Sequence, residues 1–233
     1  MTDLWNKYNQ TRLAGDKKTA NKLLQEIIDI LRQKDQKFVT DFTDNLCKRT
    51  LNLNKVLSNN GTEVSNNIDR IQHPLFKEII LPILADKYLN DSPLHIKWIG
   101  QFEQFFYSDY KMTQQFLKQI NIDGYFSTTY FFEKSFAIDN NQDTLNLLLR
   151  RTAQDIEFNL HELPFTVLAE PNTLNSILNY FENYWNKSNN KEKWKLQLTE
   201  WQNIAKHWTK YFAEKEKYSN FMEYQEQQKI ELC

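Results

Sequence analysis

The sequence predicts an all-α fold, either an irregular multi-helix bundle or stacked helical hairpins, with about 9–11 helices. Glycine is scarce, with 4 residues in 233, and glycine supplies the positive-φ turns of β-hairpins and phosphate-binding loops. Aromatic residues are abundant, with 6 Trp, 11 Tyr and 16 Phe available to fill the space between helices. Apolar residues also recur at three- and four-residue spacing, which places them on one face of a helix.

The first 56 residues predict an N-terminal unit of three helices. A short helix over 3–13 is followed by Gly15 at the position of a C-terminal stop, and Asp16 can cap the second helix. The third helix begins at about Asp35. The apolar faces of the second and third helices consist of Ala20, Leu24, Ile27, Ile28 and Leu31, and of Phe38, Phe42, Leu46, Thr50 and Leu53.

The polar stretch 57–67 is interpreted as a connection between two parts of the chain. It leads to a main helical domain over 68–233, and we expect the two parts to pack together as one globular unit. Pro74 and Pro93 each open a helix, because the first helical turn does not need the missing N–H. Pro82 lies inside the first of these helices and should kink it.

Further helices are predicted over 112–120 and within the aromatic-rich segment 125–138, where a strand over 127–132 is the alternative. A long helix from about Gln142 carries an apolar stripe, and helices over 173–185 and from about Lys191 follow. The stripe consists of Leu145, Leu149, Thr152, Ile156, Leu160 and Leu163.

The last long helix carries Trp194, Leu198, Trp201, Ala205, Trp208 and Phe212 at heptad spacing. Rings at this spacing are typical of a buried core, although neighbouring lysines leave a base-stacking platform as an alternative. The charged tail from Glu214 is expected to fray.

The corner Ser135–Asn141, followed by Leu145 and Leu148, resembles the junction between the two helices of a tetratricopeptide repeat. Trp5, Tyr8, Gly15–Asp16 and Ala20 are similar to positions in the first helix of that repeat. The resemblance covers about two units and lacks the regular period of about 34 residues. It implies stacked helical hairpins with a grooved face, and no binding residues carry over from it.

Charge and cysteine content narrow the class of protein. The net charge is −1 and only 6 of the 29 basic residues are Arg, so we expect no nucleic-acid partner. Cys47 and Cys233 form no disulfide framework, which fits a reducing cytoplasm. The N-terminus does not resemble a signal peptide, and no apolar run is long enough to predict a membrane partner. Composition rich in Asn, Lys, Ile and Phe suggests an AT-rich bacterial genome.

The sequence contains no Walker loop, dinucleotide fingerprint or Gly-x-Ser-x-Gly motif, so no cofactor or metal is expected and an enzyme is not favoured. Polar residues on and beyond the long helix form the candidate binding set, which consists of Arg150, Arg151, Asp155, Glu157, His161 and Glu162. The simplest interpretation of this set is a solvated, ion-paired face. The alternative is a metal- or acid/base-dependent enzyme, in which His161, Glu157 and Glu162 are catalytic and an arginine holds an anionic substrate.

Charge is distributed unevenly along the chain. Residues 1–56 carry 11 basic and 7 acidic side chains, and residues 183–218 carry 8 and 4, which gives +4 in each segment. Residues 137–182 carry 2 basic and 7 acidic side chains, or −5. We therefore predict a cytoplasmic bacterial protein that acts by binding another protein with a basic surface, and an immunity-type protein that neutralises a toxin is the most concrete form of this hypothesis.

Overall fold

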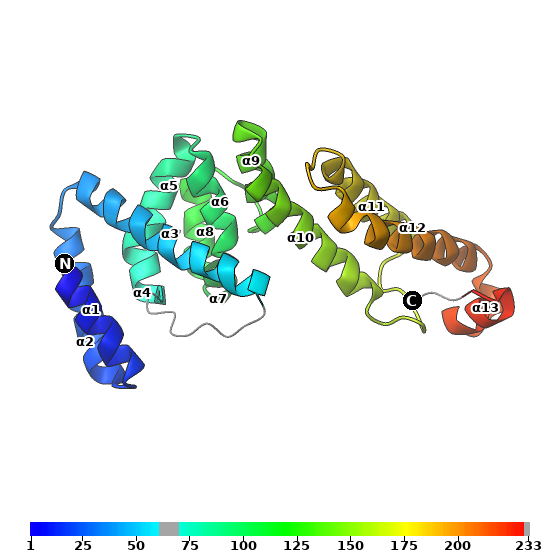
Figure 1. Cartoon of the computed structure of the whole chain (residues 1–233), viewed down its shortest axis with the longest axis horizontal. Helices are drawn as coiled ribbons and strands as arrows, with labels where there is room; N and C mark the ends of the chain where they lie inside the picture. The colour runs from blue at the N-terminus through cyan, green and yellow to red at the C-terminus, as the bar shows by residue number, and fades with distance from the viewer. Residues whose placement is uncertain (61–69, 231–233) are drawn as a thin grey trace. The chain divides into compact units, whose positions relative to one another are not determined.

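The computed structural model describes residues 1–60 and 70–230, and every regular element in this part of the chain is helical (Figure 1). The all-α prediction is therefore confirmed. Contacts divide the chain into two compact units, Met1–Phe131 (unit 1) and Phe132–Cys233 (unit 2). This division differs from the expected one, which lay at 57–67. Residues 61–67 of that expected connection lie outside the described part.

Unit 1 joins the three N-terminal helices to the helices that follow them. Helix α1 packs on α2, and both α2 and α3 pack on the π-helical segment η1. The described elements of this unit are α1 (Thr2–Leu13), α2 (Lys17–Arg32), α3 (Gln36–Asn60), α4 (His73–Leu75), η1 (Phe76–Ile80), α5 (Leu81–Leu89), α6 (Pro93–Gln101), α7 (Glu103–Ser108), α8 (Tyr110–Gln119) and the start of α9 (Thr128–Asp139). Helix α4 is the start of the helix that Pro74 was predicted to open.

The predicted helix boundaries in unit 1 have the expected local causes. Gly15 follows α1 with a φ of 82°. The side chain of Asp16 accepts a hydrogen bond from the backbone N–H of Thr19 at the start of α2, over 3.0 Å. Asp35 does the same for Phe38 at the start of α3, over 2.9 Å. These carboxylates satisfy backbone donors that the first helical turn leaves unpaired.

The region around Pro82 departs from a simple kink. Helix α4, segment η1 and α5 follow one another without interruption, and Pro82 occupies the first turn of α5. The N–H of Leu81 bonds to the carbonyl of Phe76, five residues earlier. The wider π-type turn thus stands directly before the proline, which has no N–H to continue the usual pattern.

The core of unit 1 is rich in packed rings. Phe76 stacks on Phe105, with ring centroids 4.2 Å apart, and meets Phe102 and Phe106 edge-on at 5.4 and 5.6 Å. Phe106 also stacks on Phe126 at 4.3 Å. The aromatic residues therefore fill the space between helices, as their abundance predicted.

Unit 2 consists of consecutive helices that pack on their neighbours in sequence. Its elements are the remainder of α9, α10 (Gln142–Leu160), α11 (Pro171–Trp185), α12 (Glu192–Ala213), the 3-10 segment η2 (Lys215–Lys217) and α13 (Phe221–Gln228). Helix α11 packs on both α10 and α12. The predicted stripe of α10 is buried from Leu145 to Leu160, and Leu163 is partly buried. The strand alternative over 127–132 is wrong, because helix α9 begins at Thr128.

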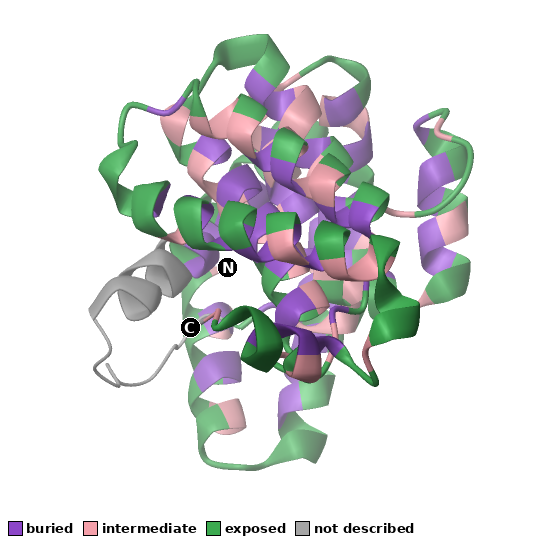
Figure 2. Cartoon of the chain, turned by 90° about the vertical axis from the view of Figure 1, so that its right-hand side faces the viewer, coloured by how far each residue is buried: buried purple, intermediate pink, exposed green. Residues whose placement is uncertain are grey.

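Buried and exposed residues alternate along the helices, as their periodicity predicted (Figure 2). Trp194, Trp201 and Trp208 of α12 are all buried, and Phe181 of α11 meets the first two edge-on at 5.6 and 5.4 Å. Rings enclosed in this way cannot stack on nucleic-acid bases. The core interpretation of this stripe is therefore confirmed, and the base-stacking alternative is wrong.

The expectation that the tail frays from Glu214 is wrong for the residues up to 230. Asn220 caps α13 by accepting a hydrogen bond from the N–H of Glu223, and Phe221 is completely buried. The N–H of Phe221 also donates to the carbonyl of Phe165, over 3.2 Å. This helix was not predicted from the sequence, because its two buried rings, Phe221 and Tyr224, lie on one side of a short helix in a charged segment.

Candidate functional site

The charged residues predicted on α10 lie on the surface and make separate contacts. Arg151 pairs with Asp155 one helical turn away, over 3.4 Å. The carboxylate of Glu157 accepts a hydrogen bond from Gln197 of α12, over 3.0 Å. Burial and then the positive charge of Arg150 lower the pKa of Lys193, also on α12. Arg150 and Glu157 therefore both interact with α12.

His161 is the C-terminal cap residue of α10, and its partner is Glu162. Its Nε2 lies 3.1 Å from Oε1 of Glu162, and its Nδ1–H donates to the carbonyl of Phe158 over 2.5 Å. The side chains of His161 and Glu162 are about half exposed, at 48% and 51%. An ion pair in contact with water has little electrostatic strength.

Three large, exposed apolar side chains lie close to His161 in the sequence. Phe158 is 66% exposed and stacks on the His161 ring at 5.2 Å, while Phe165 and Leu168 are 60% and 47% exposed. The N–H of Leu168 donates to the carbonyl of Asn159, so the loop after α10 folds back along the end of the helix. We call this region the α10-end surface, defined by Phe158, His161, Glu162, Phe165 and Leu168.

The sequence interpretation found the charged half of the α10-end surface and missed its apolar half. A signal was available at Phe158, which lies two residues from both Ile156 and Leu160 of the buried stripe. Two helical residues turn the chain by about 200°, so a side chain there points away from the stripe. A phenylalanine predicted to face water is informative, because soluble proteins expose few contiguous apolar surfaces without a binding role.

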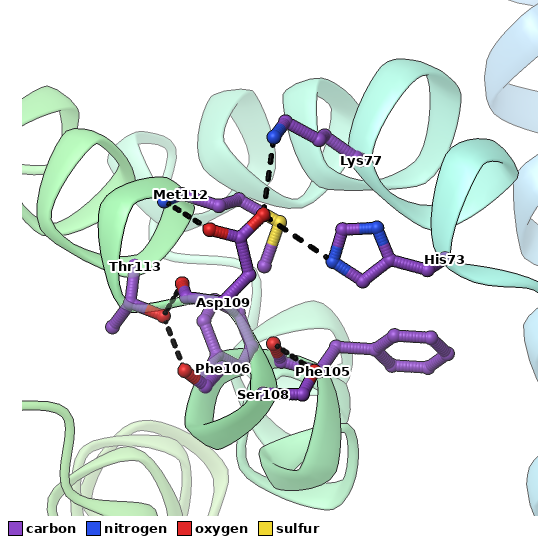
Figure 3. Close-up of polar contacts among 8 residues, drawn as sticks. All are labelled: His73, Lys77, Phe105, Phe106, Ser108, Asp109, Met112 and Thr113. Atoms are coloured by element: carbon purple, nitrogen blue, oxygen red, sulfur yellow. Dashed lines mark hydrogen bonds and ion pairs between the residues drawn. The ribbon is translucent and has the colours of Figure 1, made fainter.

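A second polar cluster lies in unit 1, around Asp109 (Figure 3). Its carboxylate is 3.1 Å from Nζ of Lys77 and 3.5 Å from Nε2 of His73, and it accepts the backbone N–H of Met112 over 2.9 Å. The hydrogen bond from Met112 and the contact with Lys77 hold the pKa of Asp109 below its usual value. The hydroxyl of Thr113 donates a hydrogen bond to the carbonyl of Phe106 over 2.6 Å. This cluster connects α4 and η1 to the start of α8.

His95 is buried and bonded at both ring nitrogens. Its Nε2 is 2.9 Å from Oδ1 of Asp44, and its Nδ1 is 2.7 Å from Oγ of Ser92. Since an ionised carboxylate only accepts, Nε2–H donates to Asp44, and Nδ1 shares the second hydrogen bond with the hydroxyl of Ser92. Hydrolases use the same residue types, but here Ser92 directly precedes α6 and its hydroxyl bonds the ring of His95 in the first turn of that helix. The arrangement joins α3 to the start of α6.

The described residues contain no group of three or more His, Cys, Asp or Glu side chains arranged to hold a metal ion. Among the same residues, no helix is both long and apolar enough to cross a membrane. No family model, curated protein or solved structure matches the chain. Functional inference therefore depends on the chemistry of the surfaces themselves.

Proposed function

We propose that this protein acts by binding another protein through the α10-end surface. The observation that carries the proposal is Phe158, a large ring that is 66% exposed next to a histidine and a carboxylate. Exposed aromatic anchors surrounded by polar groups have the composition of protein–protein interfaces. Phe165 and Leu168 are exposed apolar side chains of the loop that follows the same helix.

The charge around this surface favours a basic partner. Residues 137–182 carry a net charge of −5, from 7 acidic and 2 basic side chains. Glu162 lies within the surface, and Asp155 is on the preceding turns of α10 with its side chain 43% exposed. Opposite charges on a partner would speed association and set its orientation.

An immunity-type protein of the bacterial cytoplasm is the specific form that we propose. A toxin enzyme that acts on an anionic substrate has a basic cleft, and an acidic surface with apolar anchors can cover such a cleft. Support for this form comes from the charge pattern and the exposed anchors, and the link to toxins is an analogy between classes of protein.

The test is direct binding to the product of an adjacent gene in the native host, measured by biolayer interferometry. We expect Phe158→Ala and Glu162→Lys each to weaken binding by about tenfold or more, because central aromatic anchors and paired charges dominate interface energies. The matched control is Leu196→Ala, since Leu196 of α12 is 74% exposed and lies outside the α10-end surface.

Two results would count against the proposal. One is tight binding that neither substitution changes, which would place the interface elsewhere. The other is a complex whose affinity does not fall as salt rises, because an acidic surface meeting a basic one must be sensitive to screening.

A further inference from the structure

A cavity of about 540 Å³ lies between α1 and α3 in unit 1, on different elements from the α10-end surface. Its volume is within the range of small-molecule sites, about 300–1,000 Å³. One wall comes from the start of α1, and the other comes from one face of α3 between Phe38 and Arg49. Helix α2 separates these two helices in the sequence, so the cavity is a product of the tertiary fold.

The apolar part of the lining consists mainly of three rings. Trp5 and Phe42 meet edge-on, with their centroids 5.8 Å apart and their planes at 83°. Two rings at this angle form no parallel slot for a flat aromatic ligand. Phe38 is 38% exposed, and Lys34, which does not line the cavity, lies over its ring at 5.7 Å. The rings therefore offer apolar surface to a ligand that is not flat.

The polar part of the lining combines hydrogen-bond donors and acceptors. Asn6 and Asn45 each provide an amide with both functions, Thr2 provides a hydroxyl, and Asp41 provides acceptor oxygens. All four residues are exposed. Within the described part of the chain, their side chains make no hydrogen bond or ion pair with other residues. These groups are therefore available to a ligand in the cavity.

The charged side chains of the lining balance each other. Asp41 and Arg49 are the acidic and the basic member, and the other lining side chains are neutral. Both lie on α3, separated by a helical rise of about 12 Å. This lining favours a ligand without net charge. Arg49 has an interaction of its own within the chain, so we assign it no hydrogen bond to the ligand.

We propose that this cavity binds a neutral saccharide through one pyranose ring. Asn6, Asp41 and Asn45 bond its hydroxyls, which both donate and accept as these side chains require. Its C–H groups lie against Phe38 and Phe42, because the negative face of an aromatic ring attracts weakly positive hydrogens. The site is independent of the proposed protein interface, since its lining lies entirely in unit 1.

Amide chemical shifts of the full chain, recorded during titration with small probes, test the proposal. The probes are the methyl α-pyranosides of glucose, galactose and mannose, which differ only in the orientation of ring hydroxyls. We expect at least one to bind with a Kd of about 10 mM or lower. It should shift the signals of α1 and of residues 36–49 and leave those of α10 unchanged. Its affinity should not change between about 0.05 and 0.5 M salt, because screening acts on charged ligands.

Two control probes separate the saccharide from other ligands of similar size. Cyclohexanol has a comparable puckered ring with a single hydroxyl, and adenine is a flat heteroaromatic ring. Both should bind more weakly than the best saccharide by about fivefold or more, because cyclohexanol lacks most of the hydrogen bonds and adenine lacks a slot.

Variants at exposed positions then locate the bound ring. Asn45→Ala should weaken binding by about 3- to 10-fold, and Asp41→Ala by about tenfold or more, because hydrogen bonds to a charged group are stronger. The matched control is Gln115→Ala, which removes an exposed amide of α8 outside the lining and should leave the affinity unchanged.

Four results would overturn the proposal. They are the absence of binding by all three saccharides, equal or tighter binding of cyclohexanol or adenine, shifted signals that lie outside α1 and α3, and an affinity that neither Asn45→Ala nor Asp41→Ala changes. The first three are measured on the unaltered protein, so they do not depend on whether the variants fold.

Discussion

The carboxylate of Asp109 caps one helix and contacts side chains of two other segments. It caps α8 through the N–H of Met112, and it contacts Lys77 and His73 from the preceding helical region. The cap could be predicted from the sequence, because an aspartate before a helix is a common N-cap. The contacts with Lys77 and His73 could not, since 32 residues separate Lys77 from Asp109 and no local pattern relates them.

The Asp109 contacts should make the stability of unit 1 depend on pH. The pKa of Asp109 is lowered in the folded protein, so its stabilising effect is present above the unfolded value of 3.8 and is lost as pH falls through the folded value. Asp109→Asn keeps a capping oxygen but removes the charge. We expect this variant to be less stable than the parent at pH 7 and to approach it in acid, as measured by urea unfolding.

The matched control for this experiment is Asp123→Asn, at an exposed position in the loop after α8. A stability difference for Asp109→Asn that stays constant from pH 7 down to pH 3 would contradict a role for the Asp109 charge.

At the scale of elements, helix starts were predicted well because their causes are local. Asn141 accepts hydrogen bonds from the N–H groups of Asp143 and Thr144 at the start of α10, over 2.9 and 3.3 Å. A kink was predicted at Pro82, and the structure has a π-type turn directly before this residue. Helix α13 was missed, since two buried rings in a charged segment do not make a recognisable period.

The cap at Asn141 should contribute measurably to unit 2. We expect Asn141→Ala to lower the free energy of unfolding by about 1 kcal/mol, the usual effect of losing a side-chain cap. Asn141→Asp keeps an acceptor oxygen and should retain most of the stability. Chemical denaturation followed by tryptophan fluorescence measures both, and equal losses in the two variants would show that the capping oxygen is not the cause.

At the scale of the whole molecule, the chain contains two cores of comparable character. One extends from Trp5 to Phe131, and the other extends from Phe136 to Tyr224. The sequence predicted a division at 57–67, where polarity rises, yet the structure divides inside α9. Helix α9 has no change in composition at that point, so contact between distant residues alone sets the boundary.

Because the two units have separate cores, a core substitution in one unit should destabilise mainly that unit. Phe221→Ala removes a completely buried ring from unit 2 and should cost about 3–5 kcal/mol. Hydrogen exchange should show reduced protection in residues 132–230 and near-parental protection in α2 and α5. Met222→Ala, at a 36% exposed neighbour, is the control and should change little. Equal loss of protection in both units would contradict the division.

The sequence by itself determined the all-α class, most helix positions and the membership of the apolar stripes, because helical periodicity and capping act over a few residues. It also located the charged half of the α10-end surface. Only the tertiary structure decided which distant groups meet. The contacts of Asp44 with His95 and of Asp109 with Lys77 depend on chain segments that come together through packing, which leaves no local trace in the order of residues.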